Sequence, residues 1–481
     1  TYAALAVRVE RLAAGLQARG IGRGDRIAIL AENRAEYVEA MLAAGRIGAI
    51  LACQNWRLAA PELAHCLRLV APVLTIVSPR HAGALAALEQ SSSGPPLPGP
   101  VLTLGAEYEA LIAAAPSRPV LPDFDPEDGL LILYTSGTTG LPKGALISQR
   151  AELARMAAFR LDLAVAGNDG FCAWAPMFHM ASADHLLATL MSGGPVIVVD
   201  GMQPDAIAAA AARFPLGWLV LMPGAIEPMI AELAARPIAP HGIRAVGAMA
   251  DLVPTHQLVA ITRLLRAPYL NSFGATETGL PPASAALIPP GEAPASLAKR
   301  QSALCELRLL DPDGGEVADG ATGEMAIRGP TVFSGYWDAG ETNRRDFLGG
   351  FFRMGDLFRR NPDGSFDFVD RAKYMIKSGG ENIYPAEIER VLLADPRIAE
   401  AVVVRARDPR WGEVPRAYIV RRDPALSEAD IEALCRAALA GYKRPREVRF
   451  VAMEELPRST TGKIQRHVLE RTEDEADLAD P

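Results

Sequence analysis

Apolar runs of strand length alternate with amphipathic helical segments along about the first 270 residues of the chain. The runs Arg26 to Leu30 and Leu130 to Tyr134 are typical of buried strands. The segments from residue 1 to Arg19 and from Glu36 to Gly45 instead place apolar side chains on one helical face. Strands that alternate with helices predict an α/β sheet domain.

The pattern changes near residue 295, where strands begin to follow one another. Glu306 to Leu310 and Glu324 to Arg328 are predicted strands that flank the turn-rich sequence DPDGG, and NPDG at Asn361 to Gly364 predicts another hairpin. We therefore expect a β-rich subdomain that continues to about residue 370 and completes a large N-terminal domain of residues 1–370.

Residues 374–481 have the pattern of a small, separate α+β domain. Pro385 is placed to begin a helix and Ser427 to cap a second one. Ala401 to Val404 and Ala417 to Val420 are predicted strands.

Composition disfavours several classes of protein. A net charge of -8 argues against a nucleic-acid partner, because neutralising phosphates requires clustered Lys and Arg. No apolar stretch approaches the roughly 20 residues of a membrane helix, so no integral membrane association is expected. The five cysteines lie far apart and form no CxxC pair, which predicts reduced thiols in a cytoplasmic protein.

A glycine-rich loop, TSGTTGLPKG, spans Thr135 to Gly144, and a strand-like run follows it at Ala145 to Ile147. The loop is therefore expected to join two strands. Glycines that admit a ligand to the backbone, four hydroxyls and a lysine are together typical of a phosphate-binding loop. The predicted contact residues are Thr135, Ser136, Gly137, Thr138, Thr139, Gly140 and Lys143. Pro142 and Gly144 rule out a Walker loop, and a flexible glycine-threonine turn is the alternative.

Several other polar residues have ordinary explanations when each is considered alone. Lys463 would be a surface lysine, and Asp356 would be a turn aspartate, although it also suits two hydrogen bonds from ribose hydroxyls. His179 would be a packed histidine that caps a helix. Asp184 and His185 are interpreted as residues of a helix surface.

The phosphate-binding loop resembles that of the adenylate-forming superfamily of acyl-CoA synthetases, nonribosomal adenylation domains and luciferases. The resemblance continues in order along nearly the whole chain. The further matching motifs are QNWRL at 54–58, PMFH at 176–179, NSFGATE at 271–277, RMGDL at 353–357, DRAKYMIKSGGENIYP at 370–385 and PRSTTGK at 457–463.

This resemblance implies a nucleotide site. Asn271 and Phe273 would hold the adenine beside Gly274, and Thr276 would meet the α-phosphate. Glu277 would be the magnesium ligand, since Mg²⁺ prefers oxygen ligands.

The same resemblance assigns the ribose and the reacting groups. Asp356 and Arg371 would reach the ribose and phosphates. Lys463 would bridge the carboxylate of the acid and the α-phosphate of ATP, as the principal catalytic residue beside Glu277 and Thr276.

The resemblance also implies motion between two half-reactions, with a hinge near residues 371–373 at Lys373. After rotation of the C-terminal domain, Gly379, Gly380 and Trp411 would face the pantetheine of coenzyme A. The residues expected to line the acyl pocket are His179, Met180, Ala181, Met222, Gly224, Gly247, Ala248 and Met249.

The expected function is that of an ATP-dependent carboxylate-CoA ligase whose partners are ATP, Mg²⁺, coenzyme A and a carboxylic acid. The mostly apolar pocket favours a medium- or long-chain fatty acid. The alternatives are an aryl-CoA ligase, an acyl-AMP ligase that loads a carrier protein, and a catalytically silent nucleotide-binding relative. Whether the protein is a homodimer is left open.

Overall fold

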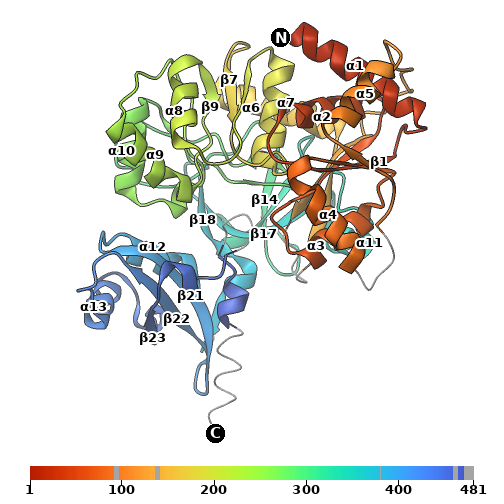
Figure 1. The fold of residues 1–481 in the computed structure, drawn as a ribbon. Coiled ribbons are helices and arrows are strands. Elements are labelled where there is room, and N and C mark those ends of the chain that lie inside the picture. The colour runs from red at the N-terminus through yellow and green to blue at the C-terminus, as the bar shows by residue number, and fades with distance from the viewer. Residues whose placement is uncertain (92–96, 136–140, 380, 459–463, 471–481) are drawn as a thin grey trace.

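The N-terminal strands form a six-stranded sheet in the order β4-β3-β1-β2-β5-β6, in which β6 is antiparallel to β5 and the other pairs are parallel (Figure 1). The computed structural model describes residues 1–91, 97–135, 141–379, 381–458 and 464–470. The strands are β1 (Arg26–Leu30), β2 (Ile50–Cys53), β3 (Leu74–Val77), β4 (Val101–Thr103), β5 (Gly129–Thr135) and β6 (Lys143–Ser148). The helices are α1 (Tyr2–Ala18), α2 (Ala35–Arg46), α3 (Ala60–Val70), α4 (Pro79–Ser91) and α5 (Ala106–Ala114). The predicted α/β alternation is confirmed.

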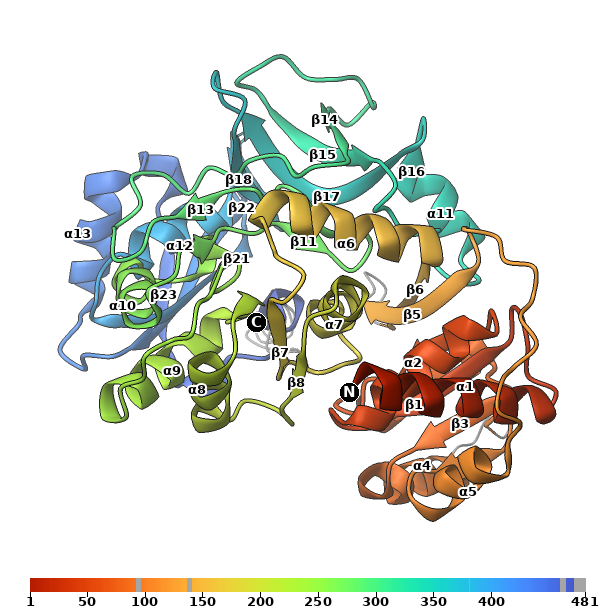
Figure 2. The ribbon, with the colours of Figure 1, turned by 90° about the horizontal axis from the view of Figure 1, so that it is seen from above.

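A second, parallel sheet has the order β8-β7-β9 and lies beside the first (Figures 1 and 2). Its strands are β7 (Gly170–Ala173), β8 (Val196–Val198) and β9 (Leu216–Trp218). The accompanying helices are α6 (Gln149–Leu163), α7 (Met180–Ser192), α8 (Pro204–Arg213), α9 (Pro223–Ala235) and α10 (Thr255–Leu265). Short pairs follow, formed by β10 (Tyr269–Leu270) with β13 (Leu287–Ile288), and by β11 (Gly274–Ala275) with β12 (Gly279–Pro282).

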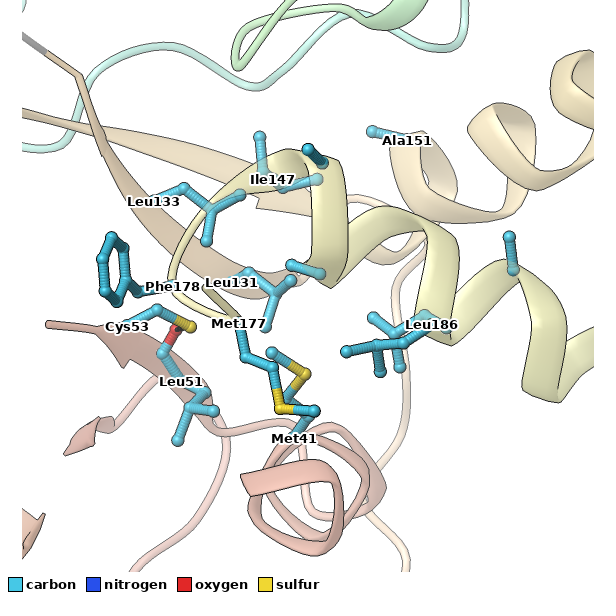
Figure 3. Packing of buried hydrophobic residues seen from close by; sticks show 14 of the residues in the cluster. Met41, Leu51, Cys53, Leu131, Leu133, Ile147, Ala151, Met177, Phe178 and Leu186 are labelled. Carbon is cyan, nitrogen blue, oxygen red and sulfur yellow. Dashed lines mark hydrogen bonds between the residues drawn. The ribbon is translucent and has the colours of Figure 1, made fainter. Parts of the chain in front are cut away.

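Side chains from both sheet regions share one core. Figure 3 shows Met41 of α2, Leu51 of β2 and Leu133 of β5 near Met177 and Leu186, and all five are at most 1% exposed. Burying a side chain of this size contributes about 1.5–3 kcal/mol. The core therefore holds α7 against the first sheet.

The expected β-rich region is an antiparallel sheet. The predicted strands are confirmed, and the hairpin at NPDG joins β17 to β18. The elements are β14 (Glu306–Leu310), β15 (Thr322–Arg328), α11 (Gly340–Asp346), β16 (Phe347–Leu348), β17 (Phe351–Arg360) and β18 (Phe366–Arg371).

The C-terminal part of the chain, blue in Figure 1, lies below the sheets and has its own core. Pro385 begins α12 (Pro385–Leu393), and Ser427 forms a capping box with Asp430 at α13 (Glu428–Ala438), as predicted. Its sheet contains β19 (Ile376–Ser378), β20 (Glu381–Ile383), β21 (Ile398–Asp408), β22 (Gly412–Arg421) and β23 (Glu447–Phe450). Within the described residues, no helix has the length and hydropathy that crossing a membrane requires.

The side chain of Asn33 joins the two sheets where the strands β1, β7 and β8 end. It follows β1, is 8% exposed, and accepts a hydrogen bond at Oδ1 from the Met177 N–H at 2.8 Å. Its Nδ2 lies 2.8–3.1 Å from four carbonyl oxygens that follow or end β7 and β8, those of Ala173, Trp174, Ala175 and Val199. The carboxyl ends of β1, β7 and β8 are thereby held together.

Asn33→Ala is expected to destabilise the protein by about 1–3 kcal/mol, because it leaves buried backbone groups without a partner. The measurement is the midpoint of thermal unfolding. Gln203→Ala is the control, since the Gln203 side chain donates to the Asp200 carbonyl at an exposed position and its loss should change stability by less than about 0.5 kcal/mol. Equal effects of the two substitutions would contradict the role given to Asn33.

Candidate active site

The predicted phosphate-binding loop starts and ends on paired strands. Thr135 ends β5 and lies opposite Lys143, the first residue of β6, which confirms that the loop joins two strands. Because β5 is parallel to β2, Thr135 lies at the carboxyl edge of the first sheet, where ligands of α/β sheets commonly bind. Five predicted contacts are outside the described residues: Ser136, Gly137, Thr138, Thr139 and Gly140.

Lys143 and Glu277 both contact the side chain of Tyr336. The Lys143 ammonium is 3.7 Å from the centre of the Tyr336 ring, and the Tyr336 hydroxyl donates a hydrogen bond to Glu277 Oε1 at 2.6 Å. The ammonium is also 3.9 Å from the Asp346 carboxylate. Burial lowers the pKa of Lys143, while the carboxylates of Asp346 and Glu277 oppose that shift. Tyr336 and Asp346 were not predicted from the sequence.

Thr276 and Glu277 occupy the tight turn between β11 and β12. At Gly274 a Cβ would lie 2.1 Å from the Gly279 carbonyl oxygen, so the turn closes only around glycine. The Thr276 carbonyl accepts from Arg155 Nη2 at 3.1 Å, and the Glu277 carbonyl accepts from the Phe333 N–H at 2.8 Å. The backbone on both sides of the predicted magnesium ligand is therefore fixed.

Arg155 of α6 holds the turn between β11 and β12 through its hydrogen bond to the Thr276 carbonyl. Its other donors reach the Thr331 carbonyl and Asp184 Oδ2, both at 3.0 Å. The interpretation of Asp184 as a helix-surface residue was wrong: it is 3% exposed, because α7 is covered by the first sheet, α6 and the second sheet. Glu152 is buried in the same group, and burial raises the pKa of both carboxyls.

His185 is also not a surface residue. It is 2% exposed, and its ring packs against Trp218 and Phe159, with centroids 4.5 and 4.9 Å away. Its Nδ1 lies 3.1 Å from the Ala181 carbonyl oxygen. Burial lowers the pKa of His185 to about 3, which keeps the imidazole neutral in this aromatic core.

The side chain of Asn271 is held by its own surroundings. Its Nδ2 donates to the Leu297 carbonyl at 2.7 Å, and its Oδ1 accepts from Lys299 Nζ at 2.6 Å. Lys299, which is 1% exposed, also donates to Asp251, and this buried ion pair gave no signal in the sequence. Asn271 lines a hollow of about 340 Å³ together with Ala286, Leu287, Ile288, Ala285, Ser296, Ala298 and Arg300.

Phe273, the other predicted adenine contact, is packed among aromatic side chains. Its ring meets Phe358 edge to face with centroids 4.6 Å apart and lies 5.9 Å from Phe368. Beyond this cluster, Asp356 and Arg371 are opposite one another on β17 and β18, and their side chains form an ion pair at 3.2 Å. The carboxylates of Asp356 and, more weakly, Glu277 raise the pKa of Arg371, so the three charges lie close enough to interact electrostatically.

The predicted acyl-pocket residues lie in three segments of the chain. His179 caps α7 by accepting from the Ala181 N–H at 3.2 Å, with Met180 beginning the helix. Gly247 has a positive φ of 81°, and a Cβ there would lie 2.0 Å from the Tyr269 ring. Ala248 exchanges hydrogen bonds with the Tyr269 hydroxyl, and the Met249 N–H donates to Ser272. Met222 caps α9, whose first turn includes Gly224.

The predicted coenzyme A residues that the structure describes lie together. Gly379 has a positive φ of 57°, its N–H donates to the Trp411 carbonyl at 2.9 Å, and a Cβ there would lie 2.7 Å from the indole. Gly380 and Lys463 are outside the described residues. The Lys373 carbonyl, in the 3₁₀ turn Ala372–Tyr374, accepts a hydrogen bond from Arg405.

These side chains fit a nucleotide with magnesium. The buried Thr135 hydroxyl has no hydrogen-bond partner among the described residues, and Thr135 is the strand partner of Lys143 at the end of the loop. In the described part of the chain, no group of three or more His, Cys, Asp or Glu side chains could hold a metal. A single carboxylate such as Glu277 is compatible with Mg²⁺, which one or two carboxylates and the substrate phosphates commonly hold.

Comparison with known proteins covers nearly the whole chain. Residues 1–337 match the family described as AMP-binding enzyme, and residues 387–463 match the AMP-binding enzyme C-terminal domain. An indoleacetate-CoA ligase from Aromatoleum aromaticum is 35% identical over 97% of this chain and 92% of its own. A feruloyl-CoA synthase from an Amycolatopsis species is 34% identical over 96% and 92%. A long-chain-fatty-acid-CoA ligase from Mycobacterium tuberculosis is 30% identical over 98% and 92%.

Solved structures agree with this assignment. The o-succinylbenzoate CoA synthetase of Bacillus subtilis, in complex with its acyl-adenylate intermediate, superposes with a TM-score of 0.82 at 27% identity, covering 98% of this chain and 93% of that one. The ATP-bound MatB of Rhodopseudomonas palustris gives 0.81 at 27% identity, with 99% and 94% covered. The chain therefore belongs to the AMP-binding enzyme family and is a ligase of the AMP-forming acid-thiol class.

Proposed function

We propose that this protein is an ATP-dependent carboxylate-CoA ligase, which forms an acyl-adenylate and then an acyl-CoA thioester with release of pyrophosphate and AMP. The observation that carries the proposal is a group of charged side chains from distant segments: Tyr336 contacts both Lys143 and Glu277, and Asp356 pairs with Arg371 at 3.2 Å. The charge of Glu277 acts on both cations. Cationic and hydroxyl groups beside a single carboxylate suit a polyphosphate with its metal ion.

In the first half-reaction, a carboxylate oxygen attacks the α-phosphorus and pyrophosphate leaves. Thr135 and Lys143 bind the departing phosphates, and Asp356 with Arg371 binds the ribose. Glu277 would hold Mg²⁺, which neutralises charge on the phosphates when bound. Lys463 offsets the repulsion between the carboxylate and the α-phosphate, so its loss raises the barrier of this step in particular.

In the second half-reaction, a thiol replaces AMP, and Lys463 must leave the site. We propose that residues 374–481 rotate as a domain relative to residues 1–370, about a hinge near 371–373 that includes Lys373. Rotation would bring Gly379 and Trp411 to the nucleotide. The absence of a Cβ at Gly379 lets the indole pack directly against the backbone of this proposed pantetheine-binding face.

We infer that the acid is an apolar aryl monocarboxylate. The relatives with 35% and 34% identity are named for indoleacetate and feruloyl substrates. The Tyr269 ring fills the space behind Gly247, and Trp218 Nε1 donates to the Gly247 carbonyl at 2.8 Å, so aromatic side chains close this wall of the predicted pocket. A medium- or long-chain fatty acid is the second candidate, because the Mycobacterium tuberculosis relative is named for that substrate.

Lys463→Ala is expected to slow adenylation by about 10²–10³-fold, as is typical when a preorganised group that stabilises transition-state charge is removed. Thioester formation from supplied acyl-adenylate should remain largely intact, because that step does not use the lysine. The measurements are acid-dependent pyrophosphate release and acyl-CoA formation. Equal losses in both half-reactions would contradict the role given to Lys463, and no AMP formation by the wild type with any acid would refute the proposed function.

A panel of acids is expected to separate the two substrate classes. Indole-3-acetate, ferulate and phenylacetate should give kcat/KM values at least about tenfold above those of octanoate and palmitate, because a closed pocket discriminates by shape. AMP and acyl-CoA are measured for each acid. A steady rise in kcat/KM with alkyl chain length would instead establish the fatty-acid alternative. Acylation of a holo-carrier protein but not of coenzyme A would show that the carrier protein is the acyl acceptor.

Gly379→Ala is expected to slow thioester formation about tenfold while leaving adenylation unchanged, because the added methyl displaces the Trp411 indole. A tenfold slower rate corresponds to an activation free energy that is about 1.36 kcal/mol higher. Gly349→Ala is a matched control: Gly349 has the same φ of 57°, and a Cβ there would meet nothing within 4 Å. Both variants therefore carry similar backbone strain. If they slow thioester formation equally, Gly379 has no role toward coenzyme A.

A further inference from the structure

Tyr336 connects two residues of the proposed ATP site that are far apart in the sequence. Its hydroxyl donates to Glu277 Oε1 at 2.6 Å, and its ring centre lies 3.7 Å from Lys143 Nζ. The side chain is largely buried, with the residue 6% exposed. The single aromatic side chain thus contacts the lysine of the phosphate-binding loop and the proposed metal ligand at once.

The backbone around Tyr336 is fixed on both sides. Residues 334–337 run along the edge of β6, where the Trp337 N–H donates to the Gly144 carbonyl at 2.7 Å and the Leu146 N–H to the Gly335 carbonyl at 3.0 Å. Asn343 accepts from the Tyr336 N–H at 2.8 Å and donates to the Tyr336 carbonyl at 2.9 Å. Tyr336 is therefore held by the same strand that Lys143 begins.

The arrangement separates two opposite charges that attract each other. An ammonium over an aromatic face is stabilised by the ring quadrupole, and a hydroxyl that donates to a carboxylate orients one of its oxygens. Without the ring, Lys143 and Glu277 would be free to form a direct ion pair, which would compete with phosphate and metal ion for both groups.

We propose that Tyr336 is a positioning residue that keeps Lys143 and Glu277 apart and correctly oriented, so that the lysine serves the phosphates and the carboxylate serves the metal ion. This inference rests on the proposed function. The hydroxyl and the ring have separable effects: the hydroxyl acts on Glu277, and the ring acts on Lys143.

Two substitutions test this separation. Tyr336→Phe removes the hydroxyl but keeps the ring, so the Mg²⁺ concentration for half-maximal rate should rise by about tenfold, while affinity for α,β-methylene-ATP without Mg²⁺ changes by less than about twofold. Tyr336→Leu removes the ring as well and should also weaken metal-free binding of the analogue by about 3–10-fold. Binding is measured by calorimetry, with and without Mg²⁺, and rates by pyrophosphate release.

Tyr108→Phe is the matched control, because the buried Tyr108 hydroxyl donates to Glu39 at 2.9 Å away from the site. It should lower the midpoint of thermal unfolding without moving the Mg²⁺ dependence. The inference is overturned if Tyr336→Phe, like this control, leaves the Mg²⁺ dependence of the rate unchanged. This outcome decides the question even if Tyr336→Leu does not fold. The proposed function alone would be refuted if the wild type formed no AMP with any acid while the wild type and the variants still bound the ATP analogue as expected. If the wild type did not bind the analogue, both the proposed function and the role of Tyr336 would be refuted.

Discussion

The amide of Asn33 brings the carboxyl ends of strands from two different sheets to one place. Buried carbonyl groups at strand ends need hydrogen-bond donors, and the Asn33 Nδ2, with its two hydrogens, lies within hydrogen-bond distance of four carbonyl oxygens that end or follow β7 and β8. The same amide accepts from the Met177 N–H, two residues before His179. The position of the predicted acyl-pocket entrance is thus coupled to the junction between the sheets.

A second constraint arises from charge buried in α6 and α7. Arg155 forms an ion pair with Asp184 near the buried carboxyl of Glu152, and its remaining donors go to backbone carbonyls at Thr276 and Thr331. A guanidinium suits this role because its planar donors point in fixed directions, whereas a lysine ammonium could not reach three partners in one plane. Arg155 therefore fixes the turn that contains Glu277 relative to the buried helices α6 and α7.

Local patterns in the sequence predicted much of this architecture, including β1, the strands on either side of the phosphate-binding loop, the first residue of α12 and the cap of α13. These features depend on nearby residues, so a local pattern is sufficient to identify them. The burial of Asp184 and His185 depends instead on a helix that is covered on several sides by distant segments. Tyr336 gave no signal for a similar reason, since Glu277 is 59 residues away and their contact exists only after the sheets assemble. Lys463 and most of the loop residues stay predictions.

Lys299 joins a residue of the predicted nucleotide site to the segment that follows the predicted acyl pocket, through one buried ammonium. It donates both to Asn271, on the nucleotide side, and to Asp251, two residues beyond Met249 of the predicted acyl pocket. A buried ammonium needs both partners to offset its desolvation. Residues 249–251 therefore cannot drift freely as the chain evolves toward a new acid, because any change that moves Asp251 also disturbs the amide of Asn271.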